Sequence, residues 1–199
     1  MIVQPDDVRG LWAHLQDRYR TTLHSKADAL EMQEIGYMLK GIGILDADAF
    51  LTRFSTTLGS RIYVPFELGV PGPDGTHSLW SQLQIGVHEH QHYVQTVRDG
   101  LAEFALRYLA SGGDRARYEA EAYRCNMELE NWHRGRPPQI KAYMHSLASY
   151  GLSSSDLEVA RRYLHSAQAT VRVGGIGTEA TRVALRWLNK HAAHLRFAD

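Results

Sequence analysis

The segment from Ser78 to Asp99 constrains the fold most, because nothing in it breaks a helix. Its apolar residues fall within one arc of a helical wheel: Leu79, Leu83, Val87 and Val94. Gly100 follows at a position suited to ending the helix. The pattern predicts a long helix that packs one face against the core and leaves the opposite face free to line a cleft.

Helical spacing recurs through most of the remaining chain. Asp6 and Asp7 can cap a first helix. The apolar residues of this helix recur at i, i+3, i+4 and i+7: Val8, Leu11, Trp12 and Leu15. Further helices are predicted at about residues 25–40, 46–58, 101–109, 114–133, 139–149, 154–170 and 177–196.

One segment has a different period. Residues Arg61–Leu68 are rich in strand-forming side chains, and the apolar ones alternate. Pro65 has no backbone N–H to donate, so we predict an edge strand that precedes the 78–99 helix. Residues 69–76, rich in Gly and Pro, form a loop between the two. The expected fold class is α+β, predominantly α-helical, with residues 1–199 in a single domain.

Composition narrows the functional classes. The chain has 199 residues, 44% of them apolar, which is enough to bury one sizeable core. Its 22 Lys and Arg residues balance 22 Asp and Glu residues, so no net charge favours nucleic acid or an anionic membrane as a partner. No apolar run is long enough to span a membrane, and the start of the chain lacks a signal pattern. Cys125 is the only cysteine and cannot form an internal disulfide, so we expect a cytoplasmic protein.

The predicted 78–99 helix carries the residues with the clearest chemistry, His88-Glu89-His90-Gln91-His92. Taken as H-E-x-x-H, this run places His88 and His92 one turn apart on one face, so both imidazoles can reach one ion. Glu89 then points beside that ion. Because the chain has as many as 11 histidines, a solvated histidine cluster is the competing interpretation.

A catalytic zinc site usually has three protein ligands, so a third one must come from elsewhere. The helix predicted at 114–133 offers Glu119 and Glu121, which alternate with alanines that allow two helices to approach closely. A helical wheel places Glu121 nearer the apolar stripe that contains Tyr118 and Cys125. Both glutamates remain candidates, and ordinary surface carboxylates are the alternative.

With H-E-x-x-H and this acidic helix, residues 60–125 resemble the zincin metallopeptidases, in particular the gluzincins. In that family a glutamate on the following helix binds zinc, often in an E-x-x-A or E-x-x-x-D setting. Glu119 and Ala122 match E-x-x-A, whereas Tyr123 stands where the second pattern has aspartate. The resemblance therefore favours Glu119.

The resemblance implies a minimal zincin-like domain that hydrolyses a peptide bond. Zn²⁺ would be bound by His88, His92 and Glu119, with Glu121 as the alternative third ligand. Glu89 would be the general base that deprotonates a zinc-activated water. Five residues are candidates for the oxyanion-stabilising group that the family usually adds: Tyr118, Tyr143, His145, Tyr163 and His165. The implied partner is a peptide or protein substrate bound along the predicted edge strand.

Other interpretations exist for the same residues. The pattern E-x-x-H occurs at Glu89–His92 and again at Glu130–His133, as in ferritin-like di-iron carboxylate proteins. That arrangement would need further glutamates, from Glu103 and from Glu31 or Glu34. The histidines could also alternate on a barrel strand around one metal, although the surrounding spacing is helical. Finally, the chain could be a catalytically silent zincin-fold binding module.

Overall fold

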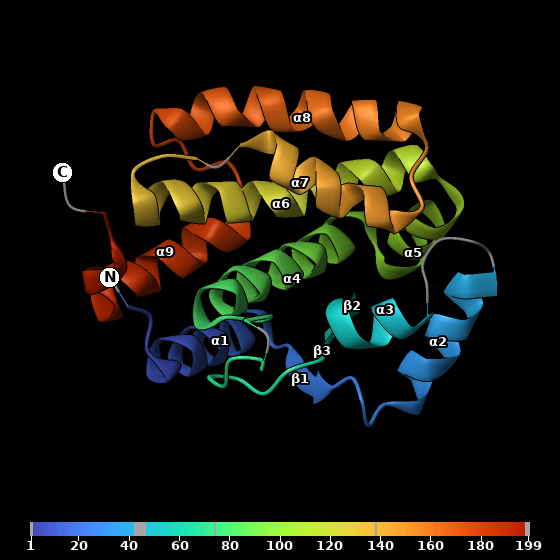
Figure 1. Ribbon diagram of the computed structural model, residues 1–199, viewed down its shortest axis with the longest axis horizontal. Coiled ribbons are helices and arrows are strands. Elements are labelled where there is room, and N and C mark those ends of the chain that lie inside the picture. The colour runs from blue at the N-terminus through green and yellow to red at the C-terminus, as the bar shows by residue number, and fades with distance from the viewer. Residues whose placement is uncertain (1, 42–46, 74, 138, 198–199) are drawn as a thin grey trace.

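The computed structural model describes residues 2–41, 47–73, 75–137 and 139–197 (Figure 1). The helices are α1 (Pro5–Tyr19), α2 (Leu30–Gly41), α3 (Ala47–Arg53), α4 (Leu79–Asp99), α5 (Leu101–Ala110), α6 (Gly112–Arg134), α7 (Ile140–Leu147), α8 (Ser154–Arg172) and α9 (Glu179–His191). The strands are β1 (Thr22–Ser25), β2 (Thr56–Leu58) and β3 (Arg61–Val64), and short 3-10 turns span Ala148–Tyr150 and Ala193–Leu195. The predominantly helical α+β fold class is confirmed.

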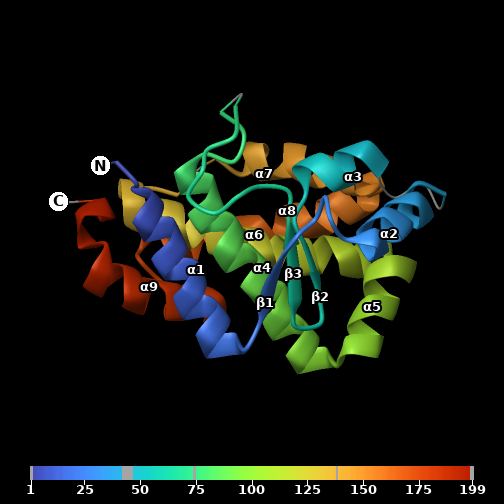
Figure 2. The ribbon, with the colours of Figure 1, turned by 90° about the horizontal axis from the view of Figure 1, so that it is seen from below.

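Helix α4 is the central helix, with α1, α6 and α9 packed around it and β2 and α5 beside it (Figures 1 and 2). Ser78 caps its start, where the Ser78 side chain accepts a hydrogen bond from Ser81 N, and Gly100, with φ +85°, follows its last residue. The face opposite the core lines a cavity at His88 and His92, as expected, but most residues from Gln82 to Thr96 are buried. Gln82, for example, makes three hydrogen bonds to the backbone of the preceding loop.

The small sheet has the strand order β1-β3-β2, with β1 parallel and β2 antiparallel to β3. The strand predicted at Arg61–Leu68 is therefore central rather than at the edge, and it ends at Val64. Pro65 lies just beyond the strand, where its missing N–H interrupts no ladder. The edge strand next to α4 is instead β2 (Thr56–Leu58), which the sequence predicted as the end of a helix.

A buried lysine anchors the segment between α3 and β2. Lys26 has no exposed surface, and its Nζ donates to the carbonyl oxygens of Phe50 and Phe54 and to Thr56 Oγ1 at 2.7–2.8 Å. The ammonium also lies 3.4 Å from the centre of the Phe50 ring, within range of a cation–π interaction. These contacts fix the position of residues that form one wall of the site described below.

Helix α6 lies between α4 and α8 (Figure 1). One apolar cluster joins it to α1, α4 and α9, and a second joins it to α7 and α8. Ala116, Ala120 and Ala122 on α6 are completely buried, and their small side chains let neighbouring helices pack closely. Packing on both sides fixes the rotation of α6 about its axis, and so decides which of its glutamates faces α4.

Gly86 allows α1 to pack directly on the backbone of α4. A Cβ at this position would lie 2.8 Å from the indole of Trp12, which is fully buried and donates from Nε1 to Gln82 O. We expect Gly86→Ala to lower the free energy of unfolding by about 1–3 kcal/mol through overpacking, despite the higher helix propensity of alanine. Chemical denaturation would measure the change.

Gly41→Ala is the matched control, because among the described residues no atom beyond its own helical turn lies within 4 Å of a Cβ built there. We expect it to leave the stability unchanged or slightly higher. A Gly86→Ala protein that is as stable as the wild type would contradict the packing of α1 on α4.

Candidate metal centre

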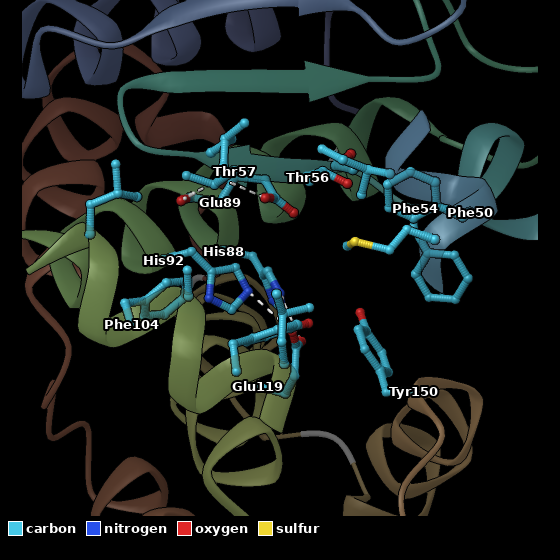
Figure 3. Close-up of a pocket in the computed structure, with 18 residues that line it drawn as sticks. Phe50, Phe54, Thr56, Thr57, His88, Glu89, His92, Phe104, Glu119 and Tyr150 are labelled. Atoms are coloured by element: carbon cyan, nitrogen blue, oxygen red, sulfur yellow. Dashed lines mark hydrogen bonds and ion pairs between the residues drawn. The ribbon is translucent and has the colours of Figure 1, made fainter. Parts of the chain in front are cut away.

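His88 and His92 on α4 face Glu119 on α6 (Figure 3). His88 Nε2 lies 3.5 Å from Glu119 Oε2, and His92 Nε2 lies 3.4 Å from Glu119 Oε1. One possible ligand atom from each residue lies within 4.8 Å of the others, and all three residues are buried. The group could hold a metal ion. In the part of the chain that the structure describes, it is the only such cluster of His, Cys, Asp or Glu.

The environment of Glu119 fits a ligand to a cation. Burial raises the pKa of this carboxyl, but the imidazoles of His92 and His88 outweigh burial and hold the pKa well below its usual range. Oε1 accepts a hydrogen bond from the Tyr108 hydroxyl at 2.5 Å. Oε2 is buried and has no hydrogen-bond partner among the described residues, which is rare for a polar atom in a protein interior. A buried carboxylate oxygen that makes no hydrogen bond and lies 3.5 Å from an imidazole nitrogen is an atom suited to metal coordination.

A second layer of hydrogen bonds orients His92. Its Nδ1 lies 2.8 Å from Gln95 Oε1, and Gln95 Nε2 donates to Tyr118 O at 3.0 Å. Because an amide oxygen only accepts, Nδ1 carries the proton and leaves Nε2 as the possible metal ligand. Burial lowers the pKa of His92, but the Glu119 charge outweighs burial and raises the pKa to about 9. Metal binding at Nε2 would therefore displace a proton.

Glu89 lies on the opposite side of the two imidazoles from Glu119 (Figure 3). Its Oε2 accepts a hydrogen bond from Thr57 Oγ1 at 2.7 Å, and the same hydroxyl lies 3.1 Å from the Glu89 backbone oxygen. Thr57 belongs to β2, so the edge strand holds the carboxylate in place. Glu89 thus lies beside the three-residue group rather than within it, where it can accept a proton.

A cavity of about 320 Å³ opens over this group. His88, Glu89, His92 and Glu119 line its polar end. Tyr150, from the turn after α7, points its hydroxyl into the cavity (Figure 3). Burial and the nearby charge of Glu119 raise the pKa of this hydroxyl well above its usual value, so it remains a hydrogen-bond donor at neutral pH.

The structure separates the two glutamates that the sequence left open. Glu121 accepts hydrogen bonds from Gln91 Nε2 at 2.8 Å and from Arg98 Nη1 at 3.1 Å, and it lies outside the His88–His92–Glu119 group. The helical wheel ranked Glu121 by its distance from the apolar stripe. It could not show that polar residues of α4 also face α6.

None of the five sequence-based candidates for the oxyanion-stabilising group lines the cavity. Tyr118 donates to Asp99 at the end of α4, and Tyr143 packs on the Tyr123 ring. The tyrosines that do line it are Tyr108 and Tyr150. Neither residue is marked by a local motif, because their position depends on how α5 and the 148–150 turn fold over α6.

The described residues do not form the di-iron arrangement. Glu130 accepts a hydrogen bond from Trp80 Nε1 at 2.6 Å, and His133 Nδ1 lies 2.5 Å from Leu195 O, both near the other end of α6. Glu103 forms an exposed ion pair with Arg107. Residues 88–92 are helical, which also excludes the barrel-strand arrangement.

No protein-family model, curated protein or solved structure matches this chain. Within the described residues, no helix combines the length and the apolar character needed to cross a membrane. Because no known protein matches, the chemistry of the site is inferred from its own geometry.

We expect the protein to bind one divalent ion per chain through the His88–His92–Glu119 group. Zn²⁺ at 100 times its dissociation constant should raise the free energy of unfolding by about 2.7 kcal/mol. His92→Ala should abolish this effect because it removes a ligand nitrogen, and Glu119→Gln should greatly reduce it because it removes the ligand charge. Thermal denaturation with and without Zn²⁺, together with elemental analysis, would measure it.

Glu121→Gln is the control, because it changes the same helix two residues away and should leave metal binding intact. Loss of binding in Glu121→Gln but not in Glu119→Gln would reassign the third ligand. Equal binding by all variants would show that the metal sits elsewhere.

Proposed function

We propose that this protein is a zinc-dependent metallopeptidase of the gluzincin type. The observation that carries the proposal is the position of Glu89 beside the buried His88–His92–Glu119 group at one end of a cavity. Two imidazole nitrogens and one carboxylate oxygen are a ligand set of catalytic zinc ions, which keep one coordination position open. Structural zinc sites use four protein ligands instead.

Zn²⁺ bound here would supply a Lewis acid that acidifies water and polarises a carbonyl group. The protein supplies the proton transfers. Glu89 accepts the proton of the attacking water and then donates it to the departing amine. Thr57 keeps the Glu89 carboxylate in position for both steps through its hydrogen bond to Oε2.

Tyr150 would stabilise the negative charge that develops on the carbonyl oxygen. Its hydroxyl points into the cavity, and its raised pKa keeps it protonated (Figure 3). A preorganised donor in a site shielded from water contributes more than it would in bulk solvent. The Phe54 ring packs edge-on against Tyr150 with 5.3 Å between ring centres, which restrains the phenol.

The edge strand β2 favours a peptide as substrate. Its outer edge has no neighbouring strand among the described residues, and Ser55 to Leu58 line the cavity. An extended peptide can add to a free sheet edge through backbone hydrogen bonds. A peptide bound along β2 would pass next to Glu89 and the metal ligands, so β2 takes the role that the sequence assigned to Arg61–Leu68.

Glu89→Gln tests the general base. The amide keeps the size of the side chain but cannot accept a proton from water, so hydrolysis should fall by about 10²–10⁴-fold while metal content stays at the wild-type level. Cleavage of a peptide library by the zinc-loaded proteins would measure activity. Loss of metal would make Glu89 a ligand, and unchanged hydrolysis would refute its role as base. A wild-type protein that binds zinc but cleaves no peptide would contradict the proposed function.

Tyr150→Phe tests the oxyanion donor. It removes only the hydroxyl, so we expect kcat to fall by about 10²-fold or more with little change in KM or metal content. Tyr143→Phe is the matched control, because this tyrosine lies outside the cavity. Equal kcat values for the two variants would assign the oxyanion donor to another group.

A further inference from the structure

Most of the cavity wall is apolar, although the cavity ends at a charged group. Phe50 of α3 and Phe54, just after that helix, lie on one side, and Phe104 of α5 lies on the other (Figure 3). Ala105 and Leu109 continue the α5 wall. The side chains beyond the metal-binding end therefore offer dispersion contacts and few hydrogen bonds.

No lysine or arginine is among the described residues that line the cavity. Its carboxylates and imidazoles all belong to the group of His88, Glu89, His92 and Glu119. A charged substrate side chain placed against the apolar wall, away from this group, would lose its hydration without gaining a partner of opposite charge. The wall thus selects against charged side chains.

The volume of the cavity sets a lower limit on the size of a side chain that can fill it. About 320 Å³ is roughly twice the volume of a dry protein cavity of about 150 Å³ that binds benzene. One aromatic ring, or a branched aliphatic side chain, fits together with the backbone atoms that must reach the metal-binding end. A glycine or alanine would leave most of the apolar wall without contacts.

The apolar surface also extends outward from the cavity. Four lining residues at its mouth are between 38% and 49% exposed: Met38, Leu58, Leu101 and Leu109. Exposed apolar residues grouped around a pocket indicate a binding site more often than a random surface. The neighbouring part of the substrate therefore meets an apolar rim.

We infer that this cavity binds one large apolar side chain, aromatic or branched aliphatic, of a peptide whose scissile bond lies over the His88–His92–Glu119 group. This inference rests on the proposed function for the identity of the substrate. The binding of the apolar group itself requires neither metal nor turnover, so the two can be tested separately.

Ala105→Phe and Ala102→Phe form a matched pair on α5. Ala105 lines the cavity, whereas Ala102 is exposed and does not. Toluene, which has the shape of a phenylalanine side chain, should bind to metal-free wild-type protein and to Ala102→Phe with equal affinity. Ala105→Phe fills the cavity and should weaken toluene binding at least about tenfold. Chemical-shift titration by NMR would give the three dissociation constants.

A second pair guards against a variant that fails to fold. Leu109→Gln places an amide in the wall, and Leu106→Gln makes the same change at a neighbouring residue that is 62% exposed and does not line the cavity. Only Leu109→Gln should weaken toluene binding. Absence of toluene binding to the wild type, or equal binding within both pairs, would overturn the inference even if the enzyme cleaved peptides.

Two hydroxamates extend the test to the zinc-loaded protein. Acetohydroxamate and 3-phenylpropanohydroxamate share a chelating group, and only the second adds a benzyl group. We expect the second to bind at least about tenfold more tightly to the wild type and Ala102→Phe, and this preference should disappear in Ala105→Phe. Toluene binding without hydroxamate binding or hydrolysis would leave the cavity assignment standing and refute the peptidase.

Discussion

Burial of the Glu119 carboxylate is the constraint on which the site depends. An uncompensated charge in a protein interior costs several kcal/mol, so this fold is stable only if other groups are directed at the carboxylate. His88 and His92 come from α4 and the Tyr108 hydroxyl comes from α5. One buried charge therefore couples the relative positions of α4, α5 and α6. The same three helices surround the end of the cavity that the His88–His92–Glu119 group lines.

Two histidines on α4 show that the effect of the Glu119 charge on neighbouring pKa values is local. His90 is fully buried against Gly86 O and Thr21 Oγ1, and burial lowers its pKa to about 4. His92, two residues later, is also buried, but Glu119 raises its pKa to about 9. Because both imidazoles are shielded from water, the carboxylate accounts for the opposite directions. The Glu119 carboxylate thus distinguishes the face of α4 that carries His92, which attracts cations, from the face that carries His90, which only packs.

The sequence predicted those features that depend on local spacing. The helices and the H-E-x-x-H face follow from a period that repeats within one segment. Strands β1 and β2 were missed because each is at most four residues long and is stabilised by pairing with β3 rather than by its own pattern. The choice between Glu119 and Glu121 depends on the rotation of α6, which two apolar clusters fix. Thr57 and Tyr150 reach the cavity only through tertiary structure, so no motif in the chain could mark them.

The apolar wall and the charged end of the cavity act together. Electrostatic interactions strengthen when water is excluded, so the proposed hydrogen bond from Tyr150 and the proposed proton transfer by Glu89 would depend on how dry the cavity is. Its mouth includes half-exposed Met38 and Leu101, so the cavity is open to water until an apolar group fills it. A large apolar side chain would then contribute to the rate as well as to binding, because it completes the environment in which charge develops. Under the proposed function, substrate specificity and catalytic power would arise from the same side chains.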